Sequence, residues 1–236
     1  MIISFNQPAF IPWGGFFAKL MSSDRMVLLD DTVLARGFTF VNRNRLKGPA
    51  GESWVTIPLK RKGLGAQKIK DLQIYEKARW RKKFLGVLQH FYAHSLYFEP
   101  VVEEIRSALD KPGTGFLELA LSLLNILKSR LGIDKEMSLQ SEFGITGRGT
   151  PLLVSAATKL GADEVILPRG SEKAVNLASF ESSGIRVRFL RFTSLPYAQF
   201  WGDFLPHLSA LDILLCCGAN GRQVIEKGTR IGGSAR

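Results

Sequence analysis

The chain has 236 residues, of which 45% are hydrophobic and 22% charged, a balance typical of a packed globular protein. No apolar run reaches the roughly 18 residues that a membrane span needs, and the first residues do not read as a secretory leader. We therefore expect a cytoplasmic protein. The length favours a single α/β domain over residues 1–228, undivided or with lobes at 1–75 and 76–228, and a disordered tail at 229–236.

The positive charge is concentrated in one part of the chain. The formal net charge is +11, from 32 Lys and Arg against 21 Asp and Glu. Between Arg36 and Lys83 there are 14 basic and 3 acidic residues, so this stretch accounts for the whole excess. A localised charge produces a directed field, which favours an anionic ligand: a nucleotide, a sugar phosphate, RNA or an anionic membrane surface. A solvated loop and helix face is the alternative.

The N-terminal segment predicts a parallel strand–helix–strand unit. Residues 2–5 form a short β-like run, residues 16–21 have helical spacing, and residues 26–30 read as a buried strand. We expect a mixed or mostly parallel sheet with flanking helices. Because ligands bind at the carboxyl ends of parallel strands, Asn6, Gln7, Asp30 and Asp31 become site candidates.

The rest of the chain alternates between helical and strand-like patterns. An irregular basic loop is expected at residues 36–51, and Thr114 and Thr150 are expected to cap helices. The predicted strands are 54–59, 69–74, 137–141, 163–167 and 185–192, and the predicted helices are 80–92, 101–109, 116–131 and 150–160.

Basic residues at the start of the predicted helix 80–92 are not explained by helix stability. Arg79, Arg81, Lys82 and Lys83 surround its first turns. Positive charge at a helix N-terminus opposes the macrodipole. Their presence therefore indicates a neighbouring or functional anion.

Two clusters are candidates for ligand binding. In residues 6–19, two prolines, two glycines and Trp13 form a rigid turn before a helix that carries Lys19; backbone N–H groups at the helix start could bind phosphate, and a turn packed on the core is the alternative. In residues 42–47, amides and basic side chains alternate and suit a carboxylate or phosphate. This second cluster comprises Asn42, Arg43, Asn44, Arg45 and Lys47.

Metal and nucleophile signatures are weak. His90 and His94 stand one helical turn apart without a third ligand nearby, so we predict no metal site and expect partly buried helix histidines. His207 reads as a loop residue. Adjacent Cys216 and Cys217 lie in an apolar stretch and favour a reducing compartment. The residues do not identify a cofactor.

Taken together, these motifs resemble the WbqC-like protein family of bacteria over nearly the whole chain. This family typically has His where the chain has Asn6, and an amide cannot serve as a base at neutral pH. The family also tends toward Ser-Gly at the positions that residues 167–170 occupy in this chain. The matching positions include Gln7-Pro8, Pro12-Trp13, Gly15, Phe17, Lys19, Ser23-Asp24, Leu29-Asp30-Asp31, Asn42-Arg43-Asn44-Arg45, Tyr197, Gln199, Phe204, Pro206, Leu208-Ser209, Asp212 and Gly218.

The resemblance implies a role in surface polysaccharide synthesis, such as that of O-antigen, because family members are often encoded among such genes. It suggests a transferase that adds an amino acid or acyl group to a nucleotide-linked or phosphorylated amino sugar. In this hypothesis Asn6 and Gln7 orient the acceptor, and Asp30 or Asp31 serves as base or metal ligand. Phosphate and substrate contacts fall to Trp13, Lys19, Asn42, Arg43, Asn44, Arg45 and Lys47.

Two alternatives remain open. The strand, proline-rich turn, helix and second strand loosely resemble the fold of cytidylyltransferases, which allows nucleotidyl transfer. Basic residues interleaved with Trp54, Tyr75 and Trp80 also suit an RNA-binding or tRNA-binding protein without its own catalysis.

Overall fold

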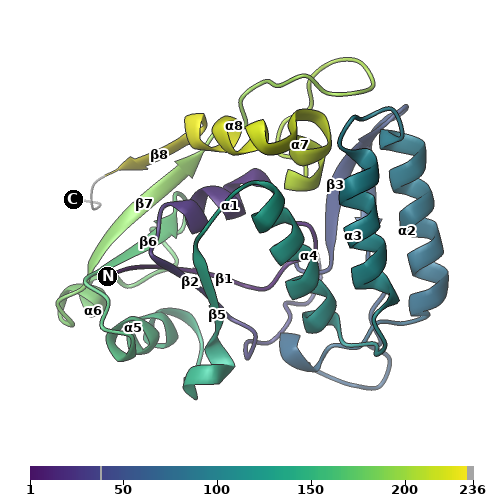
Figure 1. The fold of residues 1–236 in the computed structure, drawn as a ribbon. Helices are drawn as coiled ribbons and strands as arrows, with labels where there is room; N and C mark the ends of the chain where they lie inside the picture. Colours follow the sequence, from purple (N-terminus) through teal and green to yellow (C-terminus); the bar gives the residue numbers. More distant parts are fainter. Residues whose placement is uncertain (38, 233–236) are drawn as a thin grey trace.

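The parallel strand–helix–strand unit expected at the start of the chain is present. The computed structural model describes residues 1–37 and 39–232 (Figure 1). Strand β1 (Ile2–Asn6) runs parallel to β2 (Arg25–Leu28), and the crossover between them contains helix α1 (Gly14–Met21). Phe16, Phe17 and Leu20 of α1 are buried, as their helical spacing predicts.

A six-stranded sheet in the order β5-β2-β1-β6-β7-β8 forms the centre of the fold. The first five strands of this order are parallel, and β8 joins the edge antiparallel to β7. The expected mixed, mostly parallel sheet is thus confirmed. The chain order reverses between β1 and β6, which makes that junction a topological switch point. The remaining strands are β5 (Glu136–Leu139), β6 (Glu164–Pro168), β7 (Arg186–Phe192) and β8 (Thr229–Gly232).

The sheet joins segments from the beginning and the end of the described chain. Strands from both sides of residue 75 pair in this sheet, since β1 and β2 lie between β5 and β6. The expected disordered tail is wrong for residues 229–232, which form β8 by pairing with the exposed edge of β7. Residues 233–236 of that predicted tail lie outside the described residues.

Alternate strand residues enter two separate apolar cores, one on each face of the sheet. Val165 and Phe189 pack on one face with α5 (Gly149–Lys159) and α6 (Leu177–Glu181). On the other face, Ile166 and Leu190 belong to the core that includes α1. Figure 1 shows α1, α7 (Ala210–Cys217) and α8 (Gly221–Lys227) above the sheet and α5 and α6 below it.

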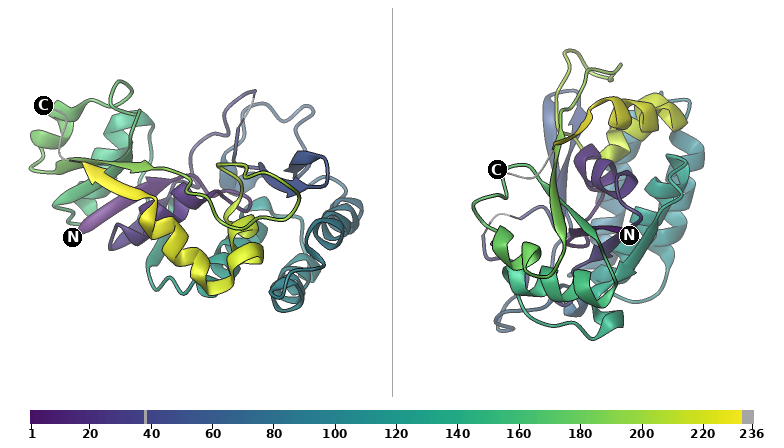
Figure 2. Two further views of the ribbon diagram at one scale, coloured as in Figure 1. Left: turned by 90° about the horizontal axis from the view of Figure 1, so that it is seen from above. Right: turned by 90° about the vertical axis from the view of Figure 1, so that its left-hand side faces the viewer.

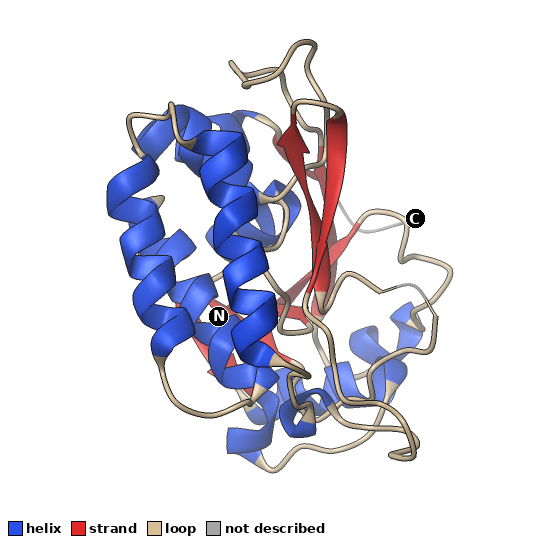
Figure 3. Ribbon diagram, turned by 90° about the vertical axis from the view of Figure 1, so that its right-hand side faces the viewer, coloured by secondary structure: helices blue, strands red, loops and turns tan. Residues whose placement is uncertain are grey.

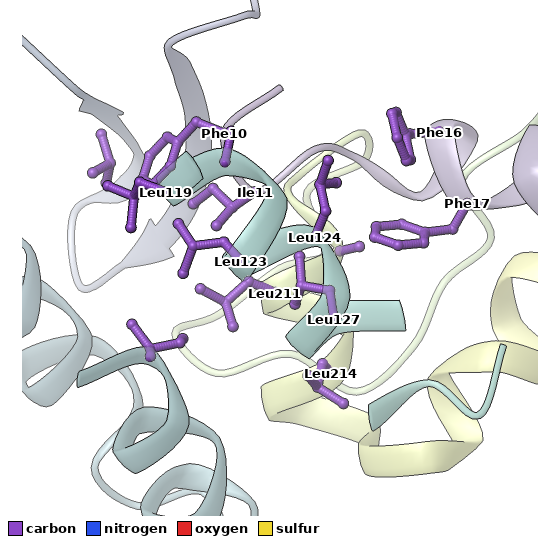
Figure 4. Packing of buried hydrophobic residues seen from close by; sticks show 14 of the residues in the cluster. Phe10, Ile11, Phe16, Phe17, Leu119, Leu123, Leu124, Leu127, Leu211 and Leu214 are labelled. Atoms are coloured by element: carbon purple, nitrogen blue, oxygen red, sulfur yellow. The ribbon is translucent and has the colours of Figure 1, made fainter. Parts of the chain in front are cut away.

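Three long helices enlarge the second core at the far end of the molecule from α5 and α6 (Figure 2). They are α2 (Lys77–Tyr92), α3 (Phe98–Asp110) and α4 (Phe116–Arg130), and Figure 3 shows the long helices packed side by side. In Figure 4, Phe10 and Ile11 of the turn after β1 meet leucines of α4 and α7. The turn between β1 and α1 is therefore anchored in the core.

The basic segment predicted as an irregular loop is instead a β-hairpin. Strand β3 (Arg43–Gly48) pairs antiparallel with β4 (Gly51–Thr56). The alternation of buried Asn44 and Leu46 with half-buried Arg43 and Arg45 has the period of a strand. The sequence does not reveal this period, because one of the buried positions holds an amide, Asn44, and not an apolar side chain.

Three local expectations were also wrong. Residues 69–74 do not form a strand: a short 3-10 helix, η1 (Ile69–Asp71), is followed by isolated bridges. Thr114 does not cap α4, because its hydroxyl bonds Gln73 Oε1 at 2.6 Å. Thr150 lies inside the first turn of α5, whose N-cap is Arg148. Two further 3-10 helices, η2 (Gln140–Phe143) and η3 (Gly218–Asn220), complete the described elements.

Candidate functional site

Two adjoining cavities lie at the switch point of the sheet. The turn cavity, of about 600 Å³, is lined by the β1 end, the following turn and the hairpin. The strand-end cavity, of about 450 Å³, is lined by α1 and the ends of β6 and β7. Asn6, Trp13 and Phe16 line both. Asn6, which was selected because ligands bind at the carboxyl ends of parallel strands (the strand-end rule), thus lies beside both cavities.

The turn between β1 and α1 holds an unfavourable backbone geometry. Ile11 has φ = 36°, a left-handed conformation that β-branched residues rarely adopt. Its carbonyl accepts hydrogen bonds from Asn44 Nδ2 (2.9 Å) and Ser209 Oγ (2.6 Å), and the N–H of Ala210 bonds the carbonyl of Pro12 (2.8 Å). Asn44 and Ser209 thus hold the turn in place, and the turn shapes the cavity wall.

Helix α1 begins directly at the cavities. Its N-cap, Trp13, makes no side-chain capping bond, and the next two residues are Gly14 and Gly15. A Cβ atom on Gly15 would lie 2.4 Å from the Trp13 ring, so only glycine allows the indole to pack there. Gly15 also lines the strand-end cavity. A helix N-terminus at this place favours an anion.

Lys19 is a buried residue that lines the strand-end cavity. Its side chain is only 5% exposed, and Nζ donates to the carbonyl of Phe5 (2.5 Å) and to Asn6 Oδ1 (2.8 Å). No carboxylate of the described chain forms an ion pair with it. Burial lowers the pKa of Lys19 from 10.5 to about 8. The group therefore titrates close to neutral pH, and an added anion would favour its charged form.

Two arginines that sequence reasoning missed complete the strand-end cavity. Arg169 follows β6 directly and Arg191 lies near the end of β7. Arg169 Nε lies 3.2 Å from a carboxylate oxygen of Glu172, and both side chains remain at the surface. The rule that selected Asn6 and Asp30 applies equally to the ends of the later strands, so this signal was available in the sequence.

The hairpin and the loop between β7 and α7 (residues 193–209, the late loop) also line the turn cavity. Arg45 Nη1 lies 2.8 Å from Glu52 Oε2, and Nη2 donates to the carbonyl of His207 at 2.8 Å. His207 was expected to be an ordinary loop residue, but it lines this cavity with its ring 5.5 Å from that of Trp13. Burial, followed by the charge of Arg45, lowers the pKa of His207 below 6.5. At neutral pH the imidazole is a proton acceptor.

The two candidate carboxylates already have partners within the protein. Asp30 is fully buried, and its oxygens accept from the backbone N–H (3.0 Å) and the hydroxyl (2.6 Å) of Ser141. Asp31 pairs with Lys70 (2.5 Å) and Lys68 (2.9 Å), and these lysines lower its pKa. Neither aspartate lines the turn cavity or the strand-end cavity.

Of the other predicted positions, some line the two cavities and some do not. Gln7 lines the turn cavity and donates to Thr32 Oγ1 at 3.0 Å. Buried Asn42 donates to the carbonyl of Ile57 at 2.8 Å. Arg43 lies on β3 and lines neither cavity. Trp13, Lys19, Asn44 and Arg45 are brought together with Asn6 and Gln7; Asn42 and Arg43 are not.

The remaining positions form a second, buried polar cluster near α7. Asp212 accepts from the hydroxyls of Tyr92 (2.5 Å) and Tyr197 (2.6 Å), and burial raises its pKa above 3.8. Lys47 Nζ donates to Gln199 Oε1 (3.1 Å) and to the carbonyls of Gly202 (3.0 Å) and Asp203. This cluster fixes the loop before α7, which carries His207.

The described residues, 1–37 and 39–232, contain neither a metal-binding cluster nor a membrane-spanning helix. In that part of the chain, no group of three His, Cys, Asp or Glu side chains is arranged to hold a metal ion. None of the described helices combines the length and apolar character needed to span a bilayer. Cys216 and Cys217 are unpaired half-buried thiols, and burial raises the pKa of both.

Comparison with known proteins identifies the family. The model of the WbqC-like protein family matches residues 7–224. The chain is also similar to the uncharacterized protein Rv1507c of Mycobacterium tuberculosis, with 28% identity over 219 residues that cover 92% of this chain and 94% of that protein. No solved structure gives a match. Since the family model spans most of the sequence, including both the turn after β1 and the late loop, the chain belongs to the WbqC-like protein family.

Proposed function

We propose that this protein is a transferase that acts on a nucleotide-linked or phosphorylated sugar, adding an amino acid or acyl group in bacterial surface polysaccharide or amino-sugar synthesis. The observation that carries the proposal is the pair of adjoining cavities at the switch point of a parallel sheet. In open α/β sheets this is where phosphate-bearing ligands bind. The family membership supports the sugar as substrate only as an analogy.

The strand-end cavity is suited to the phosphate. It combines the N-terminus of α1, the buried amine of Lys19 and the guanidinium groups of Arg169 and Arg191. Arginine binds phosphate oxygens in a bidentate manner, and backbone N–H groups at a helix start add fixed partial positive charge. This assignment moves the phosphate contacts away from Arg43 and Lys47.

The turn cavity is suited to the sugar and any base attached to it. Its volume of about 600 Å³ lies within the range of small-molecule sites, and aromatic rings of Trp13, Phe16 and Phe40 line it. Asn6 and Gln7 supply amides for orienting hydroxyl or amino groups. The phosphate would enter the adjoining cavity past Asn6, which lines both.

The proton acceptor for transfer to an amine is better assigned to His207 than to Asp30 or Asp31. His207 lines the turn cavity and is neutral at pH 7, whereas both aspartates lie outside it with their oxygens engaged. An attacking amine would form the new bond to the acyl carbon and lose its proton to the imidazole, and the bond from the acyl carbon to the donor's leaving group would break, with its electron pair going to that group. Holding both substrates in adjoining cavities would supply much of the rate.

The test is a binding titration of nucleoside diphosphates and nucleotide-linked amino sugars against matched arginine variants. Arg191→Ala is expected to weaken binding at least about tenfold, because a charged hydrogen bond contributes about 1.5–3 kcal/mol. Arg186→Ala is the control, since Arg186 is exposed at the opposite end of the same strand. Equal effects of the two substitutions would refute the site, and pyrophosphate release from a nucleoside triphosphate would favour nucleotidyl transfer instead.

A further inference from the structure

A third cavity, which the proposed transfer does not use, lies between the hairpin and helix α2. This hairpin groove has a volume of about 490 Å³ and is bounded by β4, the residues before α2 and the first turns of α2. Its floor is apolar: Trp80 and Phe84 are buried, and their rings stack at 5.2 Å with an interplanar angle of 13°. Its rim carries Trp54 and Tyr75, which are 41% and 52% exposed.

Four of the five basic residues at the start of α2 fall into two groups, and Lys82 belongs to neither. Lys77 donates to the carbonyls of Lys111 and Gly113, and Arg81 pairs with Asp110, so both attach α2 to α3. The other group, Arg79 and Lys83, lies one helical turn apart and lines the hairpin groove.

Neither cation of the groove is neutralised by a buried partner. The side chain of Arg79 is 86% exposed and its 3.4 Å contact with Glu76 is at the surface. Lys83 is exposed and forms no ion pair with any described residue. Two exposed aromatic rings beside two solvated cations form the combination that binds stacked bases and their phosphates.

The groove adjoins the turn cavity through Trp54. The ring of Trp54 lies 5.7 Å from that of Phe40 and 5.7 Å from the guanidinium carbon of Arg45, and Phe40 and Arg45 both line the turn cavity. One aromatic side chain therefore links the groove to a second cavity, which favours a ligand longer than one nucleotide. The 14 basic residues against 3 acidic ones between Arg36 and Lys83 also favour an extended polyanion.

We propose that the hairpin groove binds a single-stranded polynucleotide, with bases stacked on Trp54 and Tyr75 and phosphates near Arg79 and Lys83. The inference is independent of the proposed transferase function. A neutral carbohydrate also stacks on aromatic rings, but it carries no negative charge to attract the two solvated cations. RNA and DNA share the base and phosphate chemistry used here, and the experiment separates them.

The test is fluorescence anisotropy of a labelled adenylate RNA of roughly six nucleotides, at about 50 mM and about 200 mM salt. The wild type is expected to bind with an affinity that falls steeply with salt. Trp54→Ala and Lys83→Ala should each weaken binding about tenfold, and Trp54→Phe should restore most of it because a ring remains. The same oligomer as DNA shows whether the 2′-hydroxyl is read.

Lys82→Ala is the matched control, since Lys82 is an exposed lysine beside Lys83 that does not line the groove. If Lys82→Ala weakens binding as much as Lys83→Ala, binding follows net charge and the groove is not the site. Adenosine monophosphate that competes as well as the oligomer would refute the polynucleotide as occupant, as would the absence of binding. Arg191→Ala should leave RNA binding intact, so failure of this proposal and failure of the transferase site are distinguishable.

Discussion

Replacing Lys19 by methionine provides the sharpest test of the strand-end cavity. The substitution keeps the aliphatic length but removes a buried ammonium group that has no carboxylate partner in the described chain. Burial lowers the pKa from 10.5 to about 8, so between pH 8 and 10.5 the unfolded state binds more protons than the folded state. The free energy of unfolding of the wild type must therefore rise with pH in this window.

The magnitude follows from the size of the pKa change. At about 1.4 kcal/mol for each tenfold change in proton affinity, the wild type should gain about 3 kcal/mol relative to Lys19→Met between pH 8 and 10.5. A comparison at pH 7 alone is less informative, because Met also leaves Phe5 O and Asn6 Oδ1 without a donor, at about 1–3 kcal/mol each. Those losses are nearly independent of pH, so the slope isolates the amine.

The assay is urea denaturation of both proteins at intervals from pH 7 to 10.5. Lys227→Met serves as the control, because Lys227 is an exposed lysine on α8. A wild-type minus Lys19→Met difference that stays flat over this range would refute the reasoning. The functional counterpart is that affinity for a phosphate-bearing ligand should fall as pH rises through about 8, and that Lys19→Met should lose this dependence.

Three further predictions concern Asp30, Gly15 and Asp212. Asp30→Ala should lower the free energy of unfolding by about 2–4 kcal/mol in urea titrations, because it leaves both donors of Ser141 unpaired. Ser141→Ala should lower it by only about 1 kcal/mol, and equal losses in the two variants would contradict the prediction. Gly15→Ala should weaken nucleotide-sugar binding about tenfold, because the new Cβ would lie 2.4 Å from the Trp13 indole and must displace it. In the control Gly86→Ala the new methyl group points into open space and should slightly stabilise α2. Retained affinity in Gly15→Ala would exclude a role for the indole. Burial raises the pKa of Asp212 above 3.8. In denaturant titrations, the difference in free energy of unfolding between the wild type and Asp212→Asn should therefore shrink as pH rises above 3.8. A difference that grows with pH would contradict the raised pKa of Asp212.

Local patterns predicted the five parallel strands of the sheet but not β8. The apolar run before Asn6, the helical spacing of Phe16 and Leu20 and the following apolar run are short-range features, and they led to the parallel unit that the structure contains. The strand-end rule then selected Asn6, which lines both cavities. Applied further along the chain, it would also have selected Arg169.

Long-range contacts decided the role of the hairpin. Asn44 and Lys47 read as exposed ligand contacts, but Asn44 is buried against Ile11, 33 residues earlier, and Lys47 against Gln199, 152 residues later. A polar side chain can be buried when partners satisfy its hydrogen bonds. Those partners lie beyond any sequence window, so the pattern of alternating amides by itself predicts a loop.

The sequence by itself determined the α/β class, the parallel unit at the start and the location of the positive charge, because each depends on composition or on spacing within a few residues. Only the tertiary structure decided which polar groups face a cavity. It brought His207 and Arg45 beside Asn6, and it engaged Asp30 with Ser141, 111 residues away. Whether a charged group is free to act depends on burial and on its hydrogen-bond partners, and both are set by contacts between elements that are distant in the chain.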